Sequence, residues 1–148
     1  MAVRGGPDLL KTLGDQARRR RRVTMKAGPL VIVCDDDDGV RALMALHLER
    51  VGCKVLEARN GEEAIRLALE HDPALLVVDV RMPGLSGYDV TRELRGRLSA
   101  RVPILLISGS VLSADIHEGF EAGADAYLKK PFTGEEFRER AASLLAPD

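Results

Sequence analysis

The stretch LVIVCDD at residues 30–36 decides the fold, because an uninterrupted apolar run stops there at two acids. Two later stretches repeat the arrangement: LLVVD at residues 75–79 ends in an aspartate, and AYLKK at residues 126–130 ends in two lysines. Buried strands of a parallel sheet read as continuous apolar runs, and ligands of open α/β sheets bind outside the carboxyl ends of such strands. We therefore expect these acids and a lysine to meet at one edge of a sheet.

Apolar runs alternate with helical patterns from residue 30 onwards, which predicts an α/β fold with a doubly wound, five-stranded parallel sheet and helices on both faces. The expected strands are Leu30–Cys34, Cys53–Ala58, Ala74–Asp79, Pro103–Ile107 and Asp125–Leu128. The expected helices are Asp38–Val51, Gly61–His71, Ser86–Arg97, Ser113–Ala122 and Thr133–Leu145. The expected N-caps are Asp38, Asn60, Ser113 and Thr133. The second strand is the most polar, and we expect it at an edge of the sheet.

The length of 148 residues fits one domain with a tail. Residues 1–28 hold 8 Lys or Arg and 2 Asp or Glu, and the other residues hold 14 and 21, so the charge is divided unevenly. We predict a flexible basic N-terminal extension at residues 1–28 and a folded domain at residues 29–148. The five arginines Arg18–Arg22 have the charge for binding nucleic acid or an anionic surface. The composition favours a solvated extension, so we do not expect nucleic-acid binding.

The chain lacks the apolar segments that a membrane or secreted protein needs. It has no run of about 18 apolar residues and no apolar core with a small-residue cleavage site near its N-terminus. We expect a cytoplasmic protein without membrane contact. Cys34 closes one strand and Cys53 opens the next, which places the sulfurs at opposite edges of a parallel sheet and predicts two reduced core thiols.

The acids at the strand ends predict a metal site. Asp35 and Asp36 follow the first strand and Asp79 ends the third, so their carboxylates approach one another at the carboxyl edge. A hard divalent cation relieves the repulsion, and Mg2+ is typically held by one or two carboxylates together with phosphate oxygens. Mg2+ is therefore the expected cofactor.

Two further groups at this edge suit a phosphoryl group. Ser108 lies in a Ser-Gly-Ser turn after the fourth apolar run, where its hydroxyl and the nearby N–H groups can bond phosphoryl oxygens. Lys130 follows the last strand and offers a compact positive charge. It precedes Pro131, so this peptide bond is a candidate for the cis form.

The order of these motifs resembles the receiver domain of bacterial two-component response regulators, including the stand-alone, single-domain type. The resemblance covers residues 29–146 and rests on VIVCDDDDGVRAL, GCKVLEARNGEEAIRLA, LLVVDVRMPGLSGYDV, VPILLISG and AGADAYLKKPF. It implies a flavodoxin-like strand order of 2-1-3-4-5. It further implies that Asp79 is the phosphoacceptor, forming 4-aspartylphosphate, and that Mg2+ binds to Asp35, Asp36, Asp79 and the backbone carbonyl of Arg81.

The resemblance also assigns roles to the remaining site residues. With Asp79, the groups that carry out the transfer would be Lys130, which pairs with the phosphoryl group, and Ser108, which moves toward it. Tyr127 occupies the position of the aromatic residue that reports this movement, so Ser108 and Tyr127 would form the switch.

The implied function is that of a phosphoacceptor in a phosphorelay. A histidine kinase or a phosphotransfer protein would supply the phosphoryl group, and the switched surface would be Ser113–Leu145. Such a chain is a signalling phosphoprotein that assists its own phosphorylation and dephosphorylation, and we do not expect it to be an enzyme. Because it ends soon after the last helix without a DNA-binding module, we expect its output to run through a downstream target protein. Gly119 lies inside the fourth expected helix, which predicts that this helix is labile.

Two other functions remain open at this point. One is a receiver-like scaffold that binds partners without phosphorylation. The other is a haloacid-dehalogenase-like phosphohydrolase, since Asp35 and Asp37 have the spacing of its nucleophile motif. The hydrolase would leave Asp79 without a role, and the chain lacks a later Gly-Asp-x-x-x-Asp motif.

Overall fold

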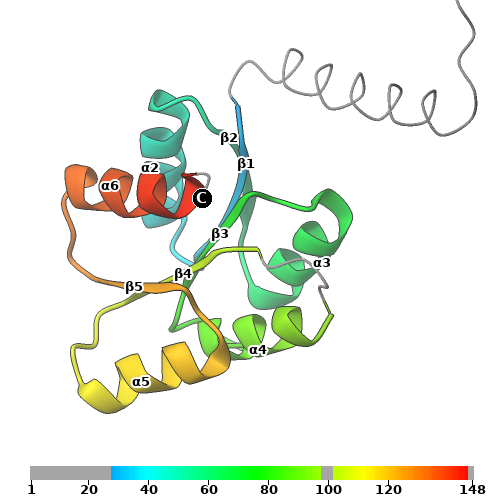
Figure 1. The fold of residues 1–148 in the computed structure, drawn as a ribbon, viewed down its shortest axis with the longest axis vertical. Helices are drawn as coiled ribbons and strands as arrows, with labels where there is room; N and C mark the ends of the chain where they lie inside the picture. Colours follow the sequence, from blue (N-terminus) through cyan, green and yellow to red (C-terminus); the bar gives the residue numbers. More distant parts are fainter. Residues whose placement is uncertain (1–27, 98–101, 147–148) are drawn as a thin grey trace, which may run out of the picture.

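The computed structural model describes residues 28–97 and 102–146, and it consists of one parallel sheet between two layers of helices (Figure 1). The strands are β1 (Leu30–Cys34), β2 (Lys54–Ala58), β3 (Leu75–Asp79), β4 (Ile104–Ser108) and β5 (Ala126–Lys129). The helices are α2 (Asp38–Arg50), α3 (Gly61–His71), α4 (Gly87–Arg97), α5 (Ser113–Ala122) and α6 (Gly134–Leu145). These bounds lie within one residue of the expected ones. Of the predicted extension at residues 1–28, all but the last residue lies outside the described residues.

The strand order is β2-β1-β3-β4-β5 with every neighbouring pair parallel, which confirms the predicted topology. The polar β2 lies at an edge, as its sequence predicts. In the register, Cys34 pairs with Val78, and Asp79 pairs with Ile107. The carboxyl ends of the three central strands are therefore level with one another, and the residues that follow them share one rim of the sheet.

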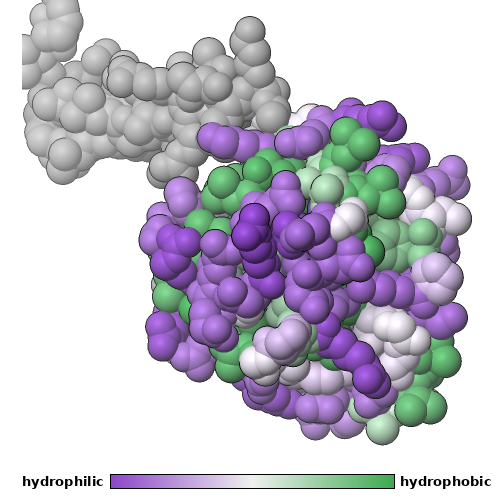
Figure 2. Space-filling model, turned by 180° about the vertical axis from the view of Figure 1, so that it is seen from behind, coloured by the Kyte–Doolittle hydropathy of each residue, from purple (hydrophilic) through white to green (hydrophobic). Residues whose placement is uncertain are grey.

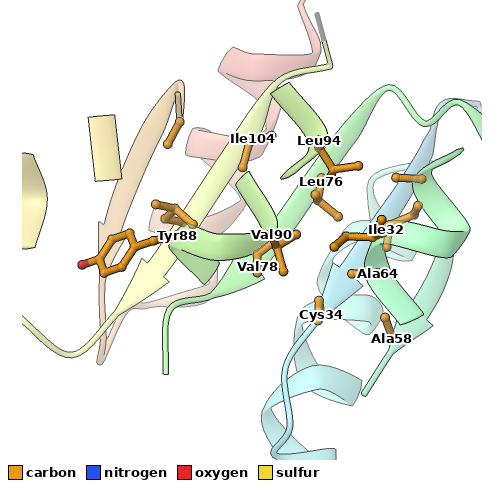
Figure 3. Packing of buried hydrophobic residues seen from close by; sticks show 14 of the residues in the cluster. Ile32, Cys34, Ala58, Ala64, Leu76, Val78, Tyr88, Val90, Leu94 and Ile104 are labelled. Carbon is orange, nitrogen blue, oxygen red and sulfur yellow. The ribbon is translucent and has the colours of Figure 1, made fainter. Parts of the chain in front are cut away.

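The core lies in two layers because successive strand residues face opposite sides of the sheet. On one side, Val33 and Val77 pack with α2 and α6 around the fully buried Phe137. On the other side, α3, α4 and α5 cover a cluster that contains Ile32 and Val78 (Figures 1 and 3). Helices on both faces were predicted from the alternation of elements, and the structure confirms this.

The helix starts confirm two of the four expected N-caps. Asn60 and Thr133 accept hydrogen bonds from backbone N–H groups of α3 and α6, and Thr133 belongs to a complete capping box. The prediction of Asp38 is wrong, because Asp37 caps α2 instead. The prediction of Ser113 is also wrong: Leu112 occupies the cap position of α5, where no side chain bonds to the helix.

The cysteines and the surface agree with a folded domain that buries its apolar residues. Cys34 and Cys53 are both buried and free of disulfides. Figure 2 shows a face in which hydrophobic residues form small groups separated by hydrophilic ones. None of the helices in the described residues is long and apolar enough to span a membrane.

Candidate functional site

Three carboxylates meet at the carboxyl edge of the sheet, as the strand ends predict. Asp35 follows β1 directly, Asp36 comes next, and Asp79 is the last residue of β3. One oxygen from each of the three carboxylates lies within 4.8 Å of the others. Asp35 and Asp79 are buried, at 1% and 4% exposure, whereas Asp36 faces solvent. Two negative charges taken out of water need compensation by positive charge nearby, and the three carboxylates are close enough together to share one metal ion.

Lys130 supplies part of this compensation. Its Nζ lies 2.8 Å from Oδ1 of Asp79 and 3.2 Å from Oδ2 of Asp35. Its backbone N–H donates to the carbonyl of Ser108 over 2.7 Å, which fixes the lysine beside the end of β4. The peptide bond to Pro131 is cis, as predicted. Lys130 therefore joins three strand ends at the point where the acids meet.

The positive charge of Lys130 balances only part of the negative charge of the three carboxylates. Burial raises the pKa of Asp79 to about 6; the hydrogen bond from Lys130 acts in the opposite direction, and the charge of Asp35 adds to the rise. Burial by itself would lower the pKa of Lys130, but its contacts with Asp79 and Asp35 raise it. At neutral pH the pair is mostly ionised, with two more carboxylates beside it. This set of hard oxygen donors fits Mg2+.

The expected switch residues lie on the neighbouring strands. Ser108 ends β4 and is buried, and its Oγ accepts the N–H of Ser110 over 3.1 Å. The hydroxyl of Tyr127, on β5, donates to the carbonyl of Ser110 over 3.3 Å. Both residues therefore bond to the backbone of Ser110, Ser108 at its N–H and Tyr127 at its carbonyl. The carbonyl of Arg81 as a metal ligand and the division of roles among these residues stay predictions.

Sequence reasoning missed Arg41, which bonds to the acidic loop, the segment between β1 and α2 that bears Asp35 and Asp36. Its side chain is buried, with Nη1 2.8 Å from the carbonyl of Asp35, Nη2 2.7 Å from Asp38 and Nε 2.9 Å from Glu57 on β2. The three-residue spacing between Asp38 and Arg41 on one helix could have indicated an ion pair. No sequence signal indicates that the same guanidinium also bonds to the loop before the helix.

Sequence reasoning also missed the hydrogen-bonded pair of Tyr88 and Asp115, which connects α4 and α5. Tyr88, in the first turn of α4, donates its hydroxyl to the carbonyl of Asp115 in α5 over 3.0 Å. The carboxylate of Asp115 in turn accepts the hydroxyl of Ser110 over 2.5 Å. The sequence alone shows a tyrosine on an amphipathic helix, which is typical of a core residue.

The family model of the response regulator receiver domain matches residues 31–142. The transcriptional regulatory protein SrrA of Staphylococcus aureus is 36% identical over 115 residues, which are 78% of this chain and 47% of SrrA. The chain thus spans about half the length of the curated relatives that it matches.

Solved structures agree with this match. The receiver domain of the Francisella response regulator 1452 superposes with a TM-score of 0.75 and is 30% identical, covering 80% of this chain and 97% of that one. The chemotaxis protein CheY4 of Vibrio cholerae gives a TM-score of 0.75 with 26% identity, covering 79% and 98%. On the sequence match, the parallel five-stranded fold and the acidic site at its carboxyl edge, the chain belongs to the response regulator receiver domains, the signalling modules of two-component systems.

Proposed function

We propose that this chain takes a phosphoryl group from the phosphohistidine of a histidine kinase or phosphotransfer protein onto Asp79. The observation that carries the proposal is the contact of Lys130 with both Asp79 and Asp35 inside a group of three carboxylates. A half-buried lysine between two acids balances one negative charge and leaves a pocket of net negative charge at the strand ends. Such a pocket suits a metal cation, and the cation and Lys130 can together bind an anionic phosphoryl group.

The transfer uses the carboxylate of Asp79 as the nucleophile. One of its oxygens attacks phosphorus in line while the bond to the phosphohistidine nitrogen breaks, and the imidazole leaves with the electron pair. The raised pKa of Asp79, about 6, still leaves the carboxylate ionised at neutral pH. Lys130 stays within reach of the new acyl phosphate and offsets the charge on its oxygens.

Asp35, Asp36, Asp79 and the backbone carbonyl of Arg81 would hold Mg2+ beside the phosphoryl group. When bound, Mg2+ supplies positive charge to the phosphoryl oxygens as they approach. Asp35 accepts the N–H of Asp37 over 2.9 Å, which orients its carboxylate toward the site before any cation arrives. Arg41 donates a hydrogen bond to the backbone carbonyl of the same residue.

The phosphoryl group would then act on the turn after β4. If the hydroxyl of Ser108 donates to a phosphoryl oxygen, the bond that its Oγ accepts from the N–H of Ser110 changes. The hydroxyl of Tyr127 donates to the carbonyl of the same Ser110, so a shift of this residue reaches Tyr127. The new group adds up to about two negative charges in a small volume, which is enough to bias an adjacent element. We place the switched surface at Ser113–Leu145 and the output in a downstream target protein that reads it.

The test is direct phosphorylation of the purified chain. Incubation with Mg2+ and a small acyl phosphate should give an acid-stable, base-labile adduct that is lost in Asp79→Asn. Asp37→Asn is the matched control, because Asp37 lies in the same acidic run, faces solvent and caps α2 through an oxygen that asparagine keeps. An adduct that persists in Asp79→Asn contradicts the proposal. Absence of any adduct favours a scaffold, and phosphate monoester turnover that depends on Asp35 favours a hydrolase.

A further inference from the structure

The chain contains two tyrosines and no tryptophan, and both tyrosines lie beneath α5. A methyl group added at Gly119, in the middle of α5, would lie 3.3 Å from Cδ2 of Tyr127 and 3.5 Å from Cε1 of Tyr88. It would also lie 3.0 Å from Cδ1 of Leu106 on β4. Glycine at this position therefore lets the helix approach both rings and the sheet.

The ring of Tyr88 lies at one end of the buried cluster, with its oxygen pointing away from Val78 and Val90 (Figure 3). Burial, together with the nearby phenol of Tyr127, holds the pKa of Tyr88 above its ordinary value, so the hydroxyl remains a donor. Its acceptor is the carbonyl of Asp115 in the first turn of α5. Because no side chain caps α5, this bond is one of the few contacts that fix the start of the helix.

The backbone next to Tyr88 is in contact with the phosphoacceptor. The N–H of Gly87 donates to the carbonyl of Val80 over 2.9 Å, and a Cβ on Gly87 would lie 2.7 Å from the carbonyl oxygen of Asp79. A hollow of about 570 Å3 opens between residues 80–88 and residues 108–115. The bond from Tyr88 to Asp115 crosses this hollow and connects the phosphoacceptor segment to the first turn of α5.

We propose that Tyr88 is a second coupling residue, which ties the first turn of α5 to the segment behind Asp79 and acts beside the contact of Ser108 and Tyr127 with Ser110. This inference rests on the proposed function and assigns it a further route. The two routes meet at Asp115: Tyr88 bonds to its carbonyl, and Ser110 bonds to its carboxylate. A displacement on either side of the hollow reaches the same helical turn.

The tie itself is tested without phosphorylation, by amide hydrogen exchange in α5. Tyr88→Phe keeps the ring and removes one hydrogen bond, which should speed exchange at residues 116–119 by about two- to tenfold. Tyr127→Phe is the comparison variant: it removes the bond to the carbonyl of Ser110 and the contact of its hydroxyl with the phenol of Tyr88, but it keeps the bond from Tyr88 to Asp115. It should speed exchange at these amides less than Tyr88→Phe does. Equal exchange in wild type and Tyr88→Phe overturns the proposal.

The coupling is tested with Tyr127→Phe, in which Tyr88 is the only tyrosine and gives the whole tyrosine band of the near-ultraviolet spectrum. Phosphorylation with Mg2+ and acyl phosphate should change this signal, and the change should vanish when Asp79→Asn is added. A phosphorylated protein with an unchanged Tyr88 signal refutes the coupling. If the wild type forms no adduct either, the proposed function is refuted and with it the coupling, while the exchange comparison still decides whether the tie exists. Gly119→Ala should alter the signals of both tyrosines before phosphorylation, and unaltered signals would contradict the packing beneath α5.

Discussion

Replacing Arg41 by methionine tests how the acidic loop is held. Methionine keeps an unbranched apolar stem in the space of the arginine stem but lacks the guanidinium. The carbonyl of Asp35 then loses a donor at 2.8 Å in a buried position, which costs about 1–3 kcal/mol. The half-exposed pair with Glu57 contributes only about 0–1 kcal/mol, because solvent replaces its partner. We expect the free energy of unfolding to fall by about 2–3 kcal/mol in total, mainly through the carbonyl.

Urea unfolding followed by circular dichroism measures this loss, with an unchanged m-value showing that the unfolded states are comparable. Two substitutions separate the bonds of Arg41. Glu57→Gln keeps the guanidinium on Asp35 and should cost less than about 1 kcal/mol. Asp38→Asn removes an acid that is 80% exposed and should leave the stability unchanged within error.

A loss of less than about 1 kcal/mol in Arg41→Met would show that water satisfies the carbonyl of Asp35 as well as the guanidinium does. A cost of Glu57→Gln as large as that of Arg41→Met would show instead that the stabilisation resides in the ion pair. In either case, the loop that bears Asp35 and Asp36 would not depend on Arg41 for its position.

Two further predictions concern α4 and the contact of α2 with α6. Gly87→Ala should lower the free energy of unfolding by about 1–3 kcal/mol, because its methyl group would meet backbone atoms at the end of β3. Gly96→Ala lies in the same helix with open space around it and should raise the free energy of unfolding by up to about 1 kcal/mol. Equal effects of the two substitutions in urea unfolding would argue against the close approach of Gly87 to β3. Burial and the charge of Arg138 lower the pKa of His47, so the unfolded chain binds a proton before the folded one. As the pH drops from 6.5 towards the lowered pKa of the folded state, the melting temperature of the wild type should therefore fall relative to that of His47→Gln, since the raised pKa of Asp79 acts equally in both proteins. Equal slopes of the two proteins would contradict this.

The strands of the sheet could be predicted because their sequences are compatible with few other structures. LVIVC, LLVVD and ILLIS are too short for helices and too apolar for surfaces, and each is bounded by charged or turn residues. The order of the strands in the sheet could not be predicted in this way, because the periodicity of a strand does not identify its neighbours. That order came from resemblance to a family, and the structure confirms it.

The site could be predicted where its residues stand at strand ends. Asp35, Asp79 and Lys130 meet because parallel strands finish at one rim, whatever the details of packing. The start of α2 was harder to predict because four consecutive aspartates are equivalent in sequence. Asp35 accepts the N–H of Asp37, the chain turns there, and the cap falls one residue earlier than expected. A local pattern cannot show which of several like side chains the fold buries.

The contacts that position α5 could not be predicted from the sequence, and Gly119 shows why. A glycine within a helix predicts weak helix formation. In the structure Gly119 has a second role that this pattern does not show, which is to make room for two tyrosine rings. With no side-chain cap and an internal glycine, α5 has little local reason to begin where it does. Its first turn is instead held through Asp115, by Ser110 on one side and Tyr88 on the other. A helix whose start depends on two contacts from the rim of the site will follow that rim when it moves, which is the property a switched surface requires.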